Sequence, residues 1–226
     1  MREPNAQLNL AAPGSLSVRI AARVRRRMFQ VFLEAFAPGE KETVLDIGVT
    51  SDQSYESSNY FEALYTFKHR ITAAGLDDAS FLERQYPGMR FVSADAMALP
   101  FADGAFDLVH SSAVIEHVGS RARQRQMLAE VLRVARRGVC VTTPNRWFPI
   151  EFHTQLPLVH WLAPPLHRPL FRLLGCGFFA AEENLNLLSR RNLLDLAAGF
   201  PGWRFEVRRQ RLLGWTSNLL LFAWRL

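Results

Sequence analysis

The segment Thr43–Asp52, TVLDIGVTSD, constrains the fold of this 226-residue chain more than any other stretch. Val44, Leu45 and Ile47 suit a strand buried on both faces, because apolar and β-branched side chains fill a pleated core. Gly48 then interrupts the apolar run, and a residue without a Cβ lets the backbone pass close to a ligand. The polar residues that follow lead into a helical pattern. A strand, a glycine turn and a helix N-terminus predict a site for a small polar or anionic group, although an ordinary strand-to-loop junction has the same pattern.

Strand and helix patterns alternate along the rest of the chain. Strands are predicted at 43–47, 70–76, 90–93, 106–111 and 139–143, and helices at 15–37, 59–68, 79–85, 119–135 and 190–198. Strands separated by helices imply right-handed βαβ units and a parallel sheet. Ligands of such sheets lie beyond the carboxyl ends of the strands, so the residues after each strand are the candidate site. Asn59, with Glu62 three residues later, resembles a capping box for the second helix, and residues 203–209 and 218–225 predict a terminal hairpin.

Composition narrows the function classes. The net charge is +6, and arginines cluster at 23–27, 121–125, 133–137 and 204–211. Such a surface attracts nucleic acid, anionic lipid or a phosphorylated substrate, but solvated helix faces are the reading we favour. Cys140 and Cys176 provide no disulfide framework and no metal spacing, which fits a reducing cytoplasm. The N-terminus lacks the apolar core of a signal peptide, and no apolar run is long enough to span a membrane.

Four motifs follow one another in a fixed order. They are VLDIG at 44–48, GLD at 75–77, ADAMALPFADGAFDLVHSSAVIEHV at 94–118 and VTTPN at 141–145. This order resembles the class I S-adenosylmethionine (SAM) dependent methyltransferases, and more narrowly the small-molecule group with an LPF…FD-V…EHV signature. The resemblance covers about Thr43–Asn145 and, less specifically, the terminal strands. It implies an α/β fold: a Rossmann-like, doubly wound, seven-stranded sheet, mostly parallel with an antiparallel last strand.

The resemblance also implies a domain organisation. We expect one domain over 1–226, with an N-terminal helical segment at 1–40, the SAM-binding core at 41–145, an apolar cap at 146–182, and a C-terminal helix and strand pair at 183–226. The cap segment is rich in Trp, Phe, Leu and Pro, which is too apolar for a linker. It favours an apolar or amphipathic acceptor such as a lipid-linked molecule, unless its side chains only bury one another.

The family's cofactor contacts map onto the strand ends. Gly48 matches the glycine that lies against the amino acid part of SAM, and Asp46 is placed to attract the ammonium group. Asp77 matches the acid that accepts hydrogen bonds from both ribose hydroxyls, since one carboxylate offers two acceptor oxygens. Asp95 matches the adenine-binding acid, with the N–H of Ala96 beside it. Any one of these aspartates alone reads as a turn or cap residue; three at successive strand ends favour the site.

The glycine loop departs from the family pattern D-x-G-x-G-x-G. Thr50 and Asp52 stand where glycine is usual, and a β-branched residue resists positive φ, so the loop must follow a different path. The hydroxyls of Thr50 and Ser51 are candidates to replace backbone contacts to the SAM carboxylate, and Ser111 is a further candidate after the fourth strand. The alternative is that SAM binding is weak or lost.

Methyl transfer from a sulfonium needs positioning and, for a protonated acceptor, a base. We predict His117, Glu116 and His153 as the catalytic group, because EHV follows the fourth strand and His153 opens the cap. A helix-start or packing role is the alternative for both histidines. His110 and Glu151 are further candidate bases. No set of Cys, Asp or Glu has metal-ligand spacing, so no metal is expected.

Three functions remain open. The first is an active SAM-dependent methyltransferase with a small or lipid-linked acceptor, and with peripheral membrane contact. The second is a catalytically silent methyltransferase-like binding module, suggested by the altered glycine loop. The third is an RNA methyltransferase that uses the arginine clusters. Nucleic acid is disfavoured, because HSSAVIEHV replaces the Asn/Asp-Pro-Pro-aromatic motif of base-amino methyltransferases.

Overall fold

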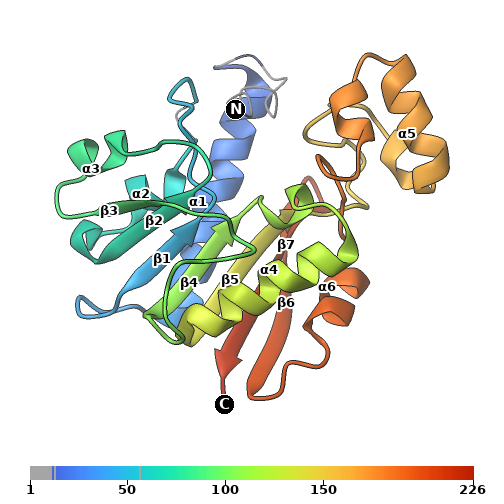
Figure 1. The fold of residues 1–226 in the computed structure, drawn as a ribbon. Coiled ribbons are helices and arrows are strands. Elements are labelled where there is room, and N and C mark those ends of the chain that lie inside the picture. Colours follow the sequence, from blue (N-terminus) through green and yellow to red (C-terminus); the bar gives the residue numbers. More distant parts are fainter. Residues whose placement is uncertain (1–11, 13, 56) are drawn as a thin grey trace.

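The computed structural model describes residue 12 and residues 14–55 and 57–226. Seven strands form one sheet in the order β3-β2-β1-β4-β5-β7-β6 (Figure 1). The strands are β1 Val44–Ile47, β2 Ile71–Gly75, β3 Arg90–Ser93, β4 Phe106–Ser112, β5 Ala135–Pro144, β6 Trp203–Leu212 and β7 Trp215–Arg225. Strands β1 to β5 pair in parallel, and β7 pairs antiparallel with both β5 and β6. The predicted Rossmann-like sheet with an antiparallel last strand is confirmed.

Strand β1 is the central strand of the five parallel strands β3-β2-β1-β4-β5. All four of its residues are buried. Its last residue, Ile47, pairs with Ala74 of β2 on one side and with Ser111 of β4 on the other. The turn after β1 therefore emerges between the ends of two neighbouring strands, where open parallel sheets bind ligands.

Helices cover both faces of the sheet (Figure 1). Helices α1 Leu16–Phe36, α2 Tyr60–Leu64 and α3 Phe81–Gln85 pack on one face, and α4 Arg121–Val134 and α6 Arg190–Ala197 pack on the other. Two short 3-10 turns, η2 Lys68–Arg70 and η3 Ile115–His117, precede β2 and α4. Ser189 and Asn192 form a capping box that fixes the start of α6, as Ser189 predicted.

The predicted second helix is shorter than its sequence pattern, and its capping box is wrong. Helix α2 ends at Leu64, and Asn59 makes no capping bond to it. The Asn59 side chain turns instead to the backbone of Thr50. Glu62 cannot reach back to the helix start, because its side chain is buried in the core. The Thr50 backbone binds the Asn59 side chain and the core buries that of Glu62, so the favourable spacing of these two residues does not produce a capping box.

The long helix α1 is held against the sheet by aromatic packing. Phe32 is fully buried, and its ring lies 5.2 Å from that of Phe61 and 5.3 Å from that of Phe36. Phe36 lies against Gly138 of β5, where an added Cβ would come within 2.3 Å of the ring. The helix can approach this closely only because position 138 has no side chain.

Residues 146–182 form the expected cap of short helices, beyond the carboxyl end of β5 (Figure 1). It contains η4 Val159–Trp161, α5 Pro164–Leu173 and η5 Gly177–Ala180. A small core joins it to the segment that follows, and consists of Phe171, Cys176, Phe179, Ala180, Leu185 and Leu187. Within the described part of the chain, no helix combines the length and apolarity needed to cross a membrane. The N-terminal stretch in which no signal peptide is expected lies outside the described residues, apart from residues 12 and 14.

A buried polar cluster lies between β1, β4 and α2. The Nδ1 of His110 donates to the carboxylate of Asp46, and the Nε2 of His110 lies 3.3 Å from the Tyr60 hydroxyl. Glu62 is completely buried beside Asp46, and its carboxylate oxygens accept from no donor among the described residues. Burial, and then the negative charge of Asp46, raise the pKa of Glu62 well above its usual range. Glu62 is therefore a proton-binding group of the folded state.

We expect Glu62→Gln to make the protein more stable than the parent at pH 8, by a margin that shrinks toward pH 5. A carboxyl whose pKa is raised by folding holds more protons in the folded chain. Its contribution to the unfolding free energy therefore falls as pH rises above the ordinary glutamate pKa of about 4.3. Glutamine keeps the shape and removes the titration. Urea unfolding at both pH values measures the difference, with Glu34→Gln on the exposed side of α1 as the control. Parallel pH profiles of parent and Glu62→Gln would contradict the assignment.

Candidate active site

A cavity of about 240 Å³ opens at the carboxyl ends of β1, β2, β3 and β4. Its walls come from the ends of these four strands, but not from residues 141–145 at the end of β5, and also from α1, α2 and the cap. The lining residues are Arg25, 46–50, 57–61, Gly75, Leu76, 94–96, 112–114, His117, Val118 and His153. A larger hollow of about 500 Å³ lies beside α4 and β6, but none of the predicted site residues lines it. The smaller cavity is therefore the candidate active site.

Gly48 shapes the floor of the cavity. Its φ is +103°, a value that L side chains rarely adopt, and an added Cβ would lie 2.1 Å from Cγ2 of Val114. Its N–H donates to the carbonyl of Ala74 over 2.7 Å. The backbone of β1 thus turns tightly between β2 and the segment after β4, in a cradle that any other residue would fill.

The loop after Gly48 follows a path that does not need the missing glycines. Neither Thr50 nor Asp52 has a positive φ. The Asn59 amide clamps Thr50, because its Oδ1 accepts from Thr50 N–H and its Nδ2 donates to Thr50 C=O, both over 2.9 Å. The hydroxyl of Thr50 accepts from the N–H of Asp52 over 3.2 Å. The Asn59 side chain thus holds the loop at Thr50, where the family pattern has glycine.

Asp46 lies in the cavity wall at the end of β1. It is buried, and burial raises its pKa to about 7. The N–H of His110 is its hydrogen-bond partner. Burial lowers the pKa of His110 to about 4, so the ring stays neutral and adds no compensating charge. A cationic group placed beside Asp46 would therefore be attracted by a carboxylate that has no cation of its own in this contact.

The other predicted cofactor residues divide into two groups. Asp95 and Ala96 line the cavity beyond the end of β3, and the Asp95 carboxylate accepts from the N–H of Met97 over 2.9 Å. Asp77 and Ser51 follow the lining residues Leu76 and Thr50, outside the wall itself. A hydrogen bond of 3.5 Å joins the Ser51 hydroxyl to the Asp77 carboxylate.

The Ser111 side chain points away from the cavity. Ser111 is fully buried, and its hydroxyl has no hydrogen-bond partner among the described residues. Ser112 lines the cavity instead, and its hydroxyl accepts from that of Thr142 over 2.9 Å. Successive residues of a strand point to opposite faces, so one position decides which serine reaches the site.

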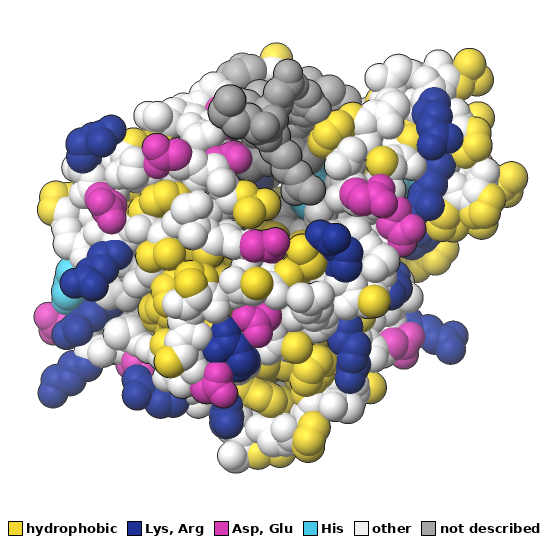
Figure 2. All heavy atoms as spheres, viewed as in Figure 1, with side chains coloured by type: hydrophobic (Ala, Val, Ile, Leu, Met, Phe, Trp, Pro, Cys, Tyr) yellow, Lys and Arg dark blue, Asp and Glu magenta, His cyan; other side chains and the backbone are white. Residues whose placement is uncertain are grey.

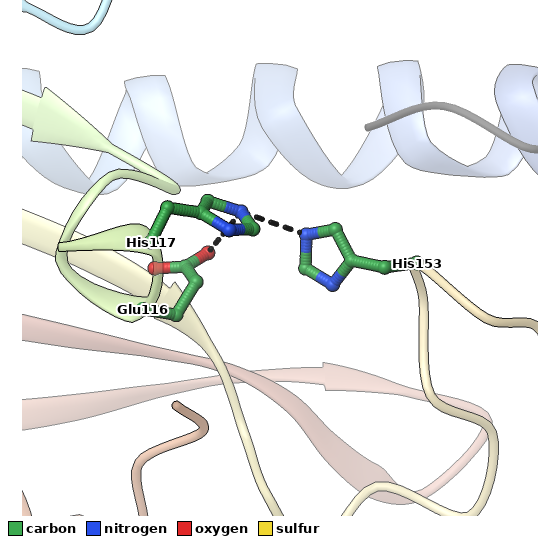
Figure 3. Close-up of side chains that lie close together, drawn as sticks. All are labelled: Glu116, His117 and His153. Atoms are coloured by element: carbon green, nitrogen blue, oxygen red, sulfur yellow. Dashed lines mark hydrogen bonds and ion pairs between the residues drawn. The ribbon is translucent and has the colours of Figure 1, made fainter. Parts of the chain in front are cut away.

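Glu116, His117 and His153 come together on the cap side of the cavity (Figure 3). The Nε2 atoms of the two histidines are 3.1 Å apart. Each Nδ1 has another partner: that of His117 lies 2.6 Å from the carbonyl oxygen of Asn184, and that of His153 lies 2.7 Å from a carboxylate oxygen of Glu151. A carbonyl can only accept, and a carboxylate that already accepts two backbone N–H groups also accepts here. Each Nδ1 thus carries a proton.

Burial and neighbouring charges shift the pKa values of these residues in different directions. Burial raises the pKa of Glu116 to about 7 and, with the charge of His153, lowers that of His117 to about 3. The Glu151 carboxylate outweighs burial at His153 and raises its pKa. In return, His153 and two backbone N–H groups outweigh burial at Glu151 and lower its pKa to about 2. The group therefore holds positive charge at His153, and the Nε2–H of His153 donates to the Nε2 lone pair of the neutral His117 over 3.1 Å.

Sequence reasoning missed several lining residues. Arg25 of α1 reaches the cavity and donates to the carbonyl of Ser57 over 2.6 Å and to its hydroxyl over 3.0 Å. Tyr60 and Val114 also line it. Val114 lies within the motif at 94–118 and Arg25 within the arginine cluster at 23–27, but neither residue was predicted to line the site. Of the further candidate bases, His110 belongs to the buried cluster and Glu151 holds His153. His160 of the cap donates to the carbonyl of Phe148.

Comparison with known proteins identifies relatives of part of this chain. Residues 45–142 match the family model described as Methyltransferase domain. The demethylmenaquinone methyltransferase of Renibacterium salmoninarum is 29% identical over 116 residues, which are 50% of this chain and 45% of that protein. The chain thus matches less than half the length of the curated relatives it resembles.

Solved structures extend the likeness to the whole fold. The 1,6-didemethyltoxoflavin-N1-methyltransferase of Burkholderia thailandensis, with bound 1,6-didemethyltoxoflavin and S-adenosylhomocysteine, aligns with a TM-score of 0.61 and 14% identity over 92% of this chain and 80% of its own. The magnesium protoporphyrin IX methyltransferase of Synechocystis PCC 6803, with bound SAH, aligns with a TM-score of 0.55 and 14% identity over 93% of this chain and 86% of its own. Residues 45–142 therefore match a methyltransferase domain, and the chain has the fold of the class I SAM-dependent methyltransferases.

Proposed function

We propose that this chain is a SAM-dependent methyltransferase that acts on a small or lipid-linked acceptor. The observation that carries the proposal is a single cavity that joins Gly48 and Asp95 at one end to His117 and His153 at the other. The strand order β3-β2-β1-β4 sets these groups side by side in that sequence. A donor subsite and an acceptor subsite can thus share one enclosed space, as in-line transfer requires.

The donor end fits SAM by the chemistry of its walls. When bound, SAM supplies a methyl group already activated by a sulfonium. Asp46 offers a carboxylate to the ammonium group, Gly48 leaves room for close backbone approach, and Asp95 offers an acceptor to the adenine amino group. Asp77, one residue beyond the lining residue Leu76, is proposed to accept from the ribose hydroxyls, with Ser51 beside it.

The acceptor end is proposed to lie between η3, α1 and the cap. The Nε2 atoms of His117 and His153 share a proton there, and His153 is held in place by Glu151. Glu116 lies beneath them, fixed by the Thr143 hydroxyl over 2.9 Å. These groups are the ones placed to receive or redirect a proton of the acceptor. Their burial excludes water from the transfer.

The outer face of the cap suits an anionic lipid surface. Pro165, Leu166, Pro169 and Leu173 are exposed at helical spacing along α5, and Leu162 just before it is also exposed, whereas His167 and Phe171 on its other side are buried. Arginines at 168 and 172 flank this apolar face, and Figure 2 shows basic and apolar side chains together on the cap. Apolar area with flanking arginine is typical of helices that lie in a membrane interface. We therefore propose peripheral membrane contact that would present a lipid-linked acceptor.

Gly48→Ala is expected to lower the affinity for S-adenosylhomocysteine at least about tenfold, because the new Cβ must displace Val114 and the +103° φ becomes strained. Isothermal titration calorimetry measures the affinity, and circular dichroism confirms folding. Gly177→Ala is the matched control, since nothing lies within 4 Å of its added Cβ. If the parent binds neither SAM nor S-adenosylhomocysteine at about 1 mM, the chain is instead a silent binding module.

Asp77→Ala should weaken SAM binding by about tenfold or more without unfolding the protein, since hydrogen bonds to a charged group contribute about 1.5–3 kcal/mol each. The neighbouring Asp78→Ala is the control, because the Asp78 carboxylate accepts locally from the N–H of Ser80. The same titration compares both variants with the parent. Equal affinities for Asp77→Ala and the parent would refute the ribose assignment.

The paired substitution Leu166→Glu and Leu173→Glu should reduce binding to phosphatidylglycerol-containing vesicles several-fold, because it places two negative charges on the apolar face of α5. Co-sedimentation measures binding, and Leu226→Glu, at the opposite end of the molecule in Figure 1, is the control. Unchanged affinity for SAM shows that the cavity is intact. Equal vesicle binding by parent and paired variant would remove the membrane proposal and leave a small soluble acceptor.

A further inference from the structure

Three metal-ligand atoms face one another at the acceptor end of the cavity (Figure 3). They are Nε2 of His117, Nε2 of His153 and Oε1 of Glu116. The two nitrogens are 3.1 Å apart, Oε1 lies 4.0 Å from the His117 nitrogen, and all three atoms lie within 4.8 Å of one another. Within the described part of the chain, this is the one group of three or more such residues that converges in this way.

The opposite side of each ligand is held by another group. Nδ1 of His117 donates to the Asn184 carbonyl, and Nδ1 of His153 donates to Glu151. The second oxygen of Glu116 accepts from the hydroxyl of Thr143. Metal-binding histidines almost always donate their other ring N–H to a carboxylate or a carbonyl, which fixes the tautomer and aims the free lone pair at the ion. Both histidines here have that arrangement.

A cation placed between the three atoms would stabilise them. Glu116 is fully buried, and its Oε1 has no hydrogen-bond partner among the described residues. A buried carboxylate oxygen left unpaired is costly. A proton can join the two nitrogens, but it leaves Oε1 unpaired, whereas a metal ion satisfies all three atoms.

We propose that Glu116, His117 and His153 bind a divalent transition-metal ion such as Zn²⁺. Two ligands at about 2.1 Å from one ion, with an angle of about 90–110° between them, lie about 3.0–3.4 Å apart, which matches the spacing of the two histidine nitrogens. The Glu116 carboxylate closes on the ion by a small rotation. Two imidazoles and one carboxylate form a donor set that suits Zn²⁺, Fe²⁺ or Mn²⁺ and leaves further positions open.

The open positions face the cavity, because His117 and His153 line it. An acceptor hydroxyl bound there would be oriented and would lose its proton to water more readily, as water bound to such ions does. This role, unlike the binding itself, rests on the proposed methyl transfer. The sequence predicted no metal, because His117 and His153 are 36 residues apart and share no motif spacing. Only the docking of the cap against η3 brings them together.

Metal binding is tested on the full chain after removal of adventitious ions by chelation. Titration with Co²⁺ is expected to give one equivalent of a visible absorption band, and calorimetry with Zn²⁺ to give one site. His117→Gln and His153→Gln should each weaken binding at least about tenfold, since each removes one of three ligands. His160→Gln, a buried histidine of the same cap that hydrogen-bonds to Phe148, should bind like the parent.

X-ray absorption on the zinc-loaded parent avoids reliance on the variants' folding. It should show two imidazole ligands at about 2.0–2.1 Å. The proposal is overturned if neither Co²⁺ nor Zn²⁺ binds at about 1 mM, if no histidine scattering is seen, or if both ligand variants bind like the parent. Every metal measurement is made without SAM, and SAM titrations use the metal-free chain. A failure of the metal site is therefore distinguishable from a failure of the methyltransferase proposal.

Discussion

The close approach of the β1 turn to its neighbours is the constraint on which the site depends. Gly48 hydrogen-bonds to Ala74 of β2 and lies against Val114, so the turn has no room for a side chain. This contact draws the ends of β1, β2 and β4 together and leaves the cavity above them. The helix α1 then closes the cavity from the side through Arg25 and Ser57. A tight backbone contact thus forms the floor of the cavity and limits its size.

Two clusters of buried polar side chains at this site show how function can oppose stability. Asp46, His110 and Glu62 are buried together, with more carboxyl oxygens than donors. On the cap side, Glu116 and the two facing histidines likewise have more acceptor atoms than donors. Buried polar atoms without partners are uncommon in folded proteins, and they concentrate where a ligand or an ion supplies the missing partner. The two imbalances lie at the donor end and the acceptor end of one cavity, which supports a shared function.

The sequence predicted the fold through long, periodic segments. Helix α1, strand β4, helix α4 and the terminal hairpin all lie within a few residues of their predicted positions. Short segments with competing partners were less predictable. Asn59 and Glu62 have the spacing of a capping box, but Asn59 clamps Thr50 and Glu62 enters the core. Local propensity determines the local structure only where no tertiary contact stabilises the same side chains more strongly.

By itself, the sequence determined the order of strands and helices, the strand ends at which polar residues gather, and the likeness to methyltransferases. These features follow from hydrophobic periodicity and from short motifs, which act within a few residues along the chain. Tertiary structure alone decided that Ser112 and not Ser111 faces the cavity, that Arg25 reaches it, and that His153 meets His117. Those outcomes depend on how a helix and the cap dock onto the sheet, and such contacts join residues far apart in sequence, where no local pattern records them.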